Sequence, residues 1–118
     1  MEKFVISKTT NGEFKYEFVD NNEQLIFSKS GYKNRGLCMN AIESIRRNIK
    51  DDSKFYRKRT PTDECYFNLK ASNGQIIGIS KVFEDKASRE ETIQHIKIAS
   101  TVAPVEDISK KQKKESLA

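Results

Sequence analysis

The sequence predicts an α+β fold in which a unit of three strands and one helix occurs twice. Three observations lead to it: a match between the two halves of the chain, alternating apolar residues bounded by turn residues, and one amphipathic helix pattern ending each half. The chain has 118 residues, of which 36% are hydrophobic. It is expected to form one compact domain, because isolated units of about fifty residues are only marginally stable.

The two halves align without a gap when the chain is shifted by 51 residues. Corresponding positions carry the same or similar residues, for example Phe4 and Phe55, Glu13 and Glu64, Asn22 and Asn73, Ile26 and Ile77, and Ile45 and Ile96. A register that holds over most of the chain indicates an internal duplication.

The first unit reads as three short strands joined by turns. An apolar strand over residues 4–6 leads to Asn11-Gly12, a dipeptide typical of a tight type I′ hairpin turn. Residues 14–19 alternate between apolar and polar, which predicts a half-buried strand. A polar turn over residues 20–23 then precedes a third strand over residues 24–28.

The second unit repeats this order with a more polar first strand. Residues 55–59 are mostly basic and are followed by Pro61, which predicts an edge strand protected against further pairing. The second strand turns Cys65, Phe67 and Leu69 inward, and Asn73-Gly74 forms the next turn. This glycine leads into a strand rather than a helix, so the turn does not fit a phosphate-binding loop.

A helix closes each unit. The first carries an apolar stripe at intervals of four, three and four residues, formed by Cys38, Ile42, Ile45 and Ile49. In the second, Ser88 and Glu91 form a capping box, and Asp85 is an alternative cap one turn earlier. His95 lies off the apolar stripe and is expected to be exposed, without a partner that orients its ring.

The predicted division of the chain is residues 1–51 for the first repeat and 52–108 for the second. The second includes "STVAPVEDIS", which is expected to be extended and to lie along the sheet or along a neighbouring chain. Residues 109–118 are rich in lysine and are expected to form a disordered basic tail.

Several functional classes are disfavoured by the residues present. Cys38 and Cys65 are expected to be buried free thiols, with a disulfide or a reactive thiol as alternatives. With one histidine and no close cysteine pair, we expect no metal and no cofactor. No catalytic triad or paired carboxylates are visible, which predicts a protein that is not an enzyme. No stretch can cross a membrane and no secretory signal precedes residue 13, so a cytoplasmic location is expected.

Two functional hypotheses remain, besides an enzyme acting at a groove between the units. The favoured one is an interaction module that binds a protein or self-associates through sheet edges, because Tyr56 and Tyr66 alternate out of phase with the core. The alternative is nucleic-acid binding, since the net charge is +5 and aromatic residues are interleaved with cations. The candidate contact residues for a partner or nucleic acid are Arg46, Arg47, Lys54, Tyr56, Arg57, Lys58 and Arg59.

The stretch "FNLKASNGQII", Phe67 to Ile77, resembles the recurrent motif of the DUF1508 family, also called UPF0339 or YegP-like. The resemblance covers residues 3–107, and the first unit departs from the motif at Phe18-Val19-Asp20 and at Glu23. It implies a small bacterial protein with two β-β-β-α repeats related by a pseudo-twofold axis, an antiparallel sheet, and helices packed against that sheet. The resemblance supplies no catalytic residues.

Overall fold

The computed structural model describes residues 1–110, which contain seven strands and two α-helices. The strands are β1 (Lys3–Lys8), β2 (Phe14–Val19), β3 (Leu25–Tyr32), β4 (Phe55–Arg59), β5 (Cys65–Lys70), β6 (Ile76–Ser80) and β7 (Val105–Asp107). The helices are α1 (Arg35–Asn48) and α2 (Lys86–Val102), and a short 3-10 turn, η1 (Asp52–Lys54), precedes β4. The predicted order of three strands and a helix, repeated once, is confirmed.

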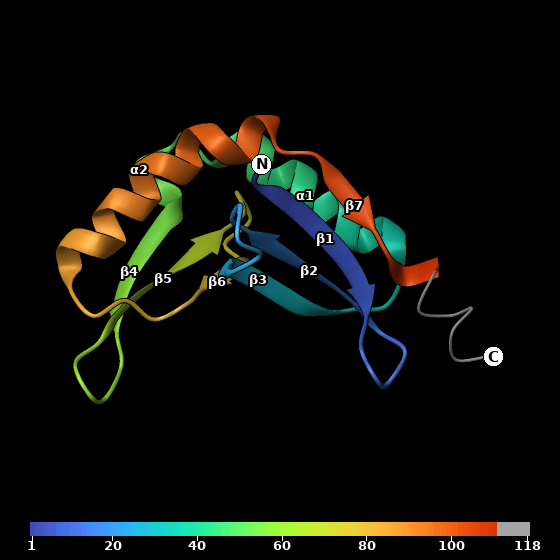
Figure 1. Cartoon of the computed structure of the whole chain (residues 1–118), viewed down its shortest axis with the longest axis horizontal. Coiled ribbons are helices and arrows are strands. Elements are labelled where there is room, and N and C mark those ends of the chain that lie inside the picture. The colour runs from blue at the N-terminus through green and yellow to red at the C-terminus, as the bar shows by residue number, and fades with distance from the viewer. Residues whose placement is uncertain (111–118) are drawn as a thin grey trace.

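All seven strands form one sheet in the order β4-β5-β6-β3-β2-β1-β7. The two repeats meet at its centre, where β3 and β6 pair antiparallel through Phe27 with Ser80 and Ser28 with Ile79. The sheet is bent like an arch, and the two helices lie over its convex side (Figure 1). Within residues 1–110, no helix lies over the opposite face of the sheet.

The two edges of the sheet differ. On one side, β7 pairs parallel with β1, so the "STVAPVEDIS" segment is extended and lies along the sheet, as expected. Its pairing departs from the antiparallel pattern of the other strands. On the other side β4 is the last strand, which confirms the edge position predicted for residues 55–59 (Figure 1).

The end of β7 is tied to the start of α1. Asp107 lies 2.6 Å from Nε of Arg35, and it accepts a hydrogen bond of 2.9 Å from the backbone N–H of Ser109. Ser109 is buried, although it begins the segment predicted as a disordered tail. The rest of that prediction, residues 111–118, lies outside the described residues.

The hairpin turns differ from the predicted type I′ geometry. Each of the four turns between described strands spans five residues, and the N–H of the fourth donates to the carbonyl of the first at 2.9–3.0 Å. Only the fourth residue has a positive φ: Gly12 (84°), Glu23 (60°), Asp63 (67°) and Gly74 (85°). Type I′ needs two positive φ values, so this prediction was wrong. An asparagine before the glycine fits either turn.

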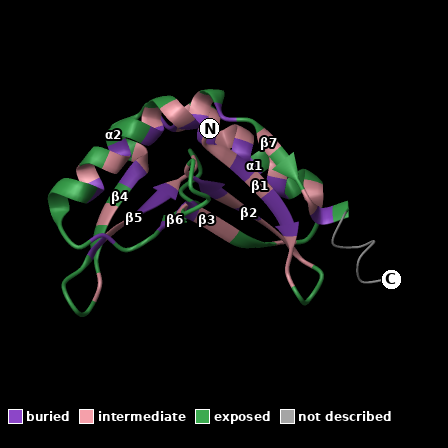
Figure 2. Ribbon diagram, in the orientation of Figure 1, coloured by how far each residue is buried: buried purple, intermediate pink, exposed green. Residues whose placement is uncertain are grey.

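The hydrophobic core lies between the sheet and the helices. Phe4, Tyr16, Phe18, Phe27 and Phe67 are fully buried, and the first four form a cluster of ring contacts within 6.2 Å. Figure 2 shows buried residues along the strands and exposed residues at the hairpin turns.

The structure tests the sequence predictions for the two cysteines and for the cap of the second helix. Cys38 and Cys65 are buried free thiols, as expected, and burial followed by the charge of Asp107 raises the pKa of Cys38 to about 11. Helix α2 is capped by Asp85, whose carboxylate accepts from the N–H of Ser88 at 2.8 Å. Asp85, the alternative to the predicted Ser88 capping box, is therefore the cap of α2.

Candidate functional site

The predicted arginines of β4 are engaged in ion pairs. Arg57 contacts Glu90 of α2 at 2.9 Å and Asp52 of η1 at 3.0 Å. Arg59 contacts Asp63 at 2.8 Å across the adjoining turn. Much of the positive charge that the sequence offers to a ligand is therefore balanced within the molecule.

Arg46 has a structural environment that the duplication repeats. Its guanidinium lies 5.6 Å from the centre of the Phe4 ring, contacts Glu43 at 2.9 Å and donates to the Ala103 carbonyl. In the second repeat the equivalent Lys97 lies 5.6 Å from the equivalent ring, that of Phe55. Arg46 therefore joins α1 to β1 and the start of the β7 segment, away from β4.

The remaining predicted residues are more accessible. Arg47 is exposed in the last turn of α1, and Lys54 is partly exposed in η1. Tyr56 and Lys58 alternate with the buried Phe55 and with Arg57, so they lie on the sheet face opposite the two described helices. The structure thus brings Tyr56 and Lys58 to one face of β4 and places Arg57 and Arg59 on the other.

The neighbouring strands extend this accessible surface. Lys58 pairs with Tyr66, and Tyr56 pairs with Asn68, which in turn pairs with Ile79. The ammonium group of Lys70 lies 3.9 Å from the centre of the Tyr56 ring, and Lys70 pairs with Ile76. We call this surface the open-face patch; it comprises Tyr56, Lys58, Tyr66, Lys70, Ile76 and Ile79.

The open-face patch combines apolar exposure with positive charge. Tyr56, Ile76 and Ile79 are 44%, 39% and 42% exposed. Strands β4, β5 and β6 contain no aspartate or glutamate. The patch therefore offers aromatic and aliphatic surface beside two lysines, without a carboxylate on its strands.

The first repeat lacks such a patch. A shift of 51 residues places Val5 opposite Tyr56, Lys15 opposite Tyr66, Glu17 opposite Asn68, and Ser28 opposite Ile79. The sequence already indicated that Tyr56 and Tyr66 lie on this face, because both alternate out of phase with the core residues. Lys70, Ile76 and Ile79 were missed, although comparing the two repeats position by position would have singled them out.

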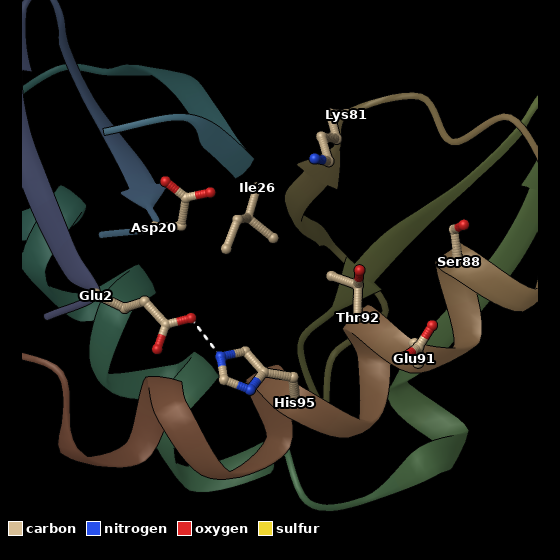
Figure 3. A pocket seen from close by; sticks show the side chains of 8 residues that line it. All are labelled: Glu2, Asp20, Ile26, Lys81, Ser88, Glu91, Thr92 and His95. Carbon is tan, nitrogen blue, oxygen red and sulfur yellow. Dashed lines mark hydrogen bonds and ion pairs between the residues drawn. The ribbon is translucent and has the colours of Figure 1, made fainter. Parts of the chain in front are cut away.

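A cleft between α2 and the first repeat is lined by several titratable side chains (Figure 3). We call it the acidic cleft; its lining includes Glu2, Asp20, Glu91, His95 and Lys81, and its volume is about 480 Å³. His95 is exposed as predicted, but its ring points toward Glu2 and contacts it, so the expected absence of a partner was wrong. Asp20 is already engaged by the backbone N–H groups of its own turn, at 2.8 and 2.9 Å.

The described residues contain neither a metal-ligand cluster nor a membrane-spanning helix. Among residues 1–110, no group of three or more histidine, cysteine, aspartate or glutamate side chains is placed to hold a metal ion. Neither of the two described helices has the length and hydropathy needed to cross a bilayer.

The duplicated unit matches a known family model. The model described as "Domain of unknown function (DUF1508)" matches residues 10–55 and again residues 62–107. The chain belongs to the DUF1508 family. The first match covers β2, β3 and α1, and the second covers β5, β6, α2 and β7. The first strand of each three-strand repeat, β1 or β4, lies outside the matches except for Phe55.

Bacterial proteins of similar length are related in sequence to this chain. The UPF0339 protein in the ptx operon 5'region of Stutzerimonas stutzeri is 36% identical over 89% of this chain and 95% of its own. The UPF0339 protein YegP of Escherichia coli K12 is 31% identical over 88% of this chain and 94% of its own.

Solved structures confirm the fold. The solution structure of a UPF0339 protein from Shewanella oneidensis covers 92% of both chains with a TM-score of 0.86 at 29% identity. That of YegP from Escherichia coli, described as a protein of unknown function, covers 92% of this chain and 93% of its own with a TM-score of 0.85 at 30% identity. These relatives share the DUF1508 architecture and carry no stated activity.

Proposed function

We propose that this DUF1508 protein is a non-enzymatic interaction module that binds single-stranded nucleic acid on its open-face patch. The observation that carries the proposal is the pairing of the Tyr56 ring with Lys70 on strands that contain no carboxylate. Aromatic rings on an open sheet stack with unpaired bases, and adjacent lysines neutralise phosphates.

Charge favours nucleic acid over a protein partner at this surface. The chain has a net charge of +5, and the ion pairs of Arg57 and Arg59 leave Lys58 and Lys70 as the cations of the patch. Each stacked base contributes about 1–3 kcal/mol, largely independently of sequence. We therefore expect binding that is salt-dependent and has little base specificity.

The sheet edges are less suited to self-association than the face. On one side β7 covers β1 and is itself the edge strand, only three residues long and carrying Glu106 and Asp107. At β4, the carbonyl of Lys58 accepts a hydrogen bond of 3.4 Å from Arg89, and basic residues follow one another along the strand. Charged side chains at an edge disfavour pairing with another chain.

The test measures fluorescence anisotropy of a labelled dT20 or U20 oligonucleotide at about 50 and 200 mM salt. The test variant combines Lys58→Glu with Lys70→Glu, and the control combines Lys15→Glu with Lys86→Glu, which changes the net charge equally. A second test variant, Tyr56→Ala, removes the ring without changing charge. Arg57 and Arg59 are not substituted, because their ion pairs support the fold.

We expect binding at low salt that is at least about tenfold weaker in the charge-reversal variant and in Tyr56→Ala, while the control stays within about twofold. Absence of binding at about 50 mM salt, or equal loss in the control, would overturn the proposal. Capture of nuclease-resistant partners that Tyr56→Ala abolishes, without oligonucleotide binding, would replace nucleic acid with a protein partner.

A further inference from the structure

The duplication creates a second cleft at the position equivalent to the acidic cleft. It lies between α1, the end of β3 and the turn between β5 and β6, and has a volume of about 620 Å³. We call it the amide cleft, because Asn40, Asn73 and Gln75 line it together with Tyr32, Lys33 and Leu37. Its size falls within the range of about 300–1,000 Å³ typical of small-ligand sites.

The two clefts share a scaffold and differ in chemistry. A shift of 51 residues places Asn40 opposite Glu91, and Ser44 opposite His95. Ala71 of the amide cleft likewise stands where the acidic cleft has Asp20. Among the described residues that line the amide cleft, none carries a carboxylate. The lining of this cleft therefore favours an anionic or neutral polar ligand over a cation.

Two polar groups of the amide cleft are available for a ligand, while two others are bonded to each other. Within residues 1–110, the carboxamide of Asn40 and the hydroxyl of Tyr32 make no hydrogen bond. The side-chain N–H of Asn73 donates to Oε1 of Gln75 at 3.4 Å, and Oδ1 of Asn73 accepts from the backbone N–H of Gln75 at 3.0 Å. Burial, followed by the charge of Cys38, raises the pKa of Tyr32 to about 12, so its hydroxyl remains a donor at neutral pH. Carboxamides both donate and accept, which suits the edge of a heterocyclic base.

The amide cleft continues toward the open-face patch. An adjoining hollow shares Gly31, Tyr32, Gln75 and Ile77 with it and adds Lys29 and Ile76. Ile76 belongs to the open-face patch and pairs with Lys70. A single strand of nucleic acid bound on the open-face patch can therefore reach the amide cleft without crossing a helix.

We propose that the amide cleft holds one unpaired nucleotide, an inference that rests on the proposed binding of single-stranded nucleic acid. The base lies against Tyr32 and Leu37, with its edge toward the carboxamides of Asn40 and Gln75. The phosphate lies near Lys33 or Lys29. The amide cleft thereby adds recognition of base edges to the open-face patch, which contacts mainly the faces of the bases and the phosphates.

The test exchanges equivalent residues between the two clefts. Asn40→Glu places a carboxylate in the amide cleft, and the matched control, Glu91→Asn, makes the reverse exchange on α2. Both positions are exposed on helices, so the fold should tolerate either change. Uridine and adenosine monophosphates are titrated into ¹⁵N-labelled protein, with inorganic phosphate as a second probe, and side-chain amide signals are followed by NMR.

We expect a mononucleotide to shift the side-chain amide signals of Asn73 and Gln75, and inorganic phosphate to shift them less. Asn40→Glu should weaken mononucleotide binding at least tenfold, and Glu91→Asn should leave it unchanged. Absence of these shifts, or equal effects of the two variants, would overturn the inference.

The oligonucleotide experiment separates this inference from the proposed function. If dT20 binding depends on Lys58 and Lys70 but mononucleotides do not shift the cleft signals, the open-face patch stands and the cleft inference fails. If mononucleotides bind the cleft while dT20 binding does not depend on the patch, the proposed function fails instead. Failure of both titrations overturns both.

Discussion

The hydroxyl of Tyr16, in the first repeat, lies 2.9 Å from the point where a side chain on Gly78, in the second repeat, would begin. The same hydroxyl donates to the carbonyl of Ile77 at 2.5 Å, and Tyr16 is fully buried. In the opposite repeat, the position equivalent to Tyr16 carries Phe67 and the position equivalent to Gly78 carries Phe27. The two repeats are therefore joined by an interaction that their duplication does not reproduce.

Gly78→Ala should destabilise the protein by about 1–3 kcal/mol, because the new methyl group would meet the Tyr16 hydroxyl and the side chains of Leu69 and Phe27. Chemical denaturation measures the free energy of unfolding. Tyr16→Phe should cost about 1–3 kcal/mol by leaving the buried Ile77 carbonyl without its donor. In the double variant the costs should be less than additive, because removing the hydroxyl relieves the contact. Strict additivity would contradict this account.

Glu23→Gly should stabilise the protein. A left-handed conformation costs a residue with a Cβ about 1–2 kcal/mol, and the greater chain entropy of glycine offsets about 0.5–1 kcal/mol of that gain. We expect a net increase of about 0.5–1 kcal/mol in the free energy of unfolding, measured in urea. Asp63→Gly is the matched comparison. It should gain less, because aspartate tolerates this conformation better and Asp63 contacts Arg59 at 2.8 Å, closer than the 3.8 Å between Glu23 and Lys3.

The ion pairs of Asp52 should make stability depend on acidic pH. Hydrogen bonds from Arg57 and then Lys97 lower the pKa of Asp52 from 3.8 to about 2. The unfolded chain therefore takes up this proton at a higher pH than the folded chain does. The contribution is fully present above about pH 4 and is lost as the pH falls through about 2. Asp52→Asn should flatten stability between these pH values, and an unchanged slope would show that Asp52 does not contribute.

Removal of β7 should expose the edge of β1. Truncation after Ala103 removes the hydrogen bond from the N–H of Phe4 to Pro104 and that from Ile108 to the carbonyl of Ile6, each of 2.9 Å. An uncovered strand invites pairing between chains. We expect lower stability and concentration-dependent association by light scattering. Truncation after Lys110, which keeps β7, is the control and should behave like the full chain.

The sequence predicted the architecture better than the site. The 51-residue spacing and the alternation of apolar residues determined the order of elements, since both depend on local pattern. The turn type was not determined, because Asn-Gly fits both a two-residue type I′ turn and the five-residue turn found here, in which the glycine has a positive φ and the asparagine does not. Arg57 was predicted to be available for a ligand because its ion-pair partners could not be identified from the sequence. Asp52 is close to Arg57 in the chain and Glu90 is distant, and both contact Arg57 only in the folded protein.

The surface positions depended on pairing register. Tyr56 and Tyr66 could be assigned to one face from their phase along each strand. Lys70 reaches the Tyr56 ring only because β5 pairs with β4 in the register that sets Tyr56 opposite Asn68. Such cross-strand neighbours follow from hydrogen-bond pairing and are invisible to a pattern read along the chain.

The contact between Tyr16 and Gly78 also limits how the two halves can be exchanged. Two copies of the first repeat would bring Phe27 to the place of Gly78 and leave no room for the Tyr16 hydroxyl. Two copies of the second would leave a void beside Gly78, because Phe67 has no hydroxyl to fill it. Each repeat is thus complementary to the other repeat and not to a copy of itself. A symmetric pair made of two identical repeats would therefore not reproduce this contact.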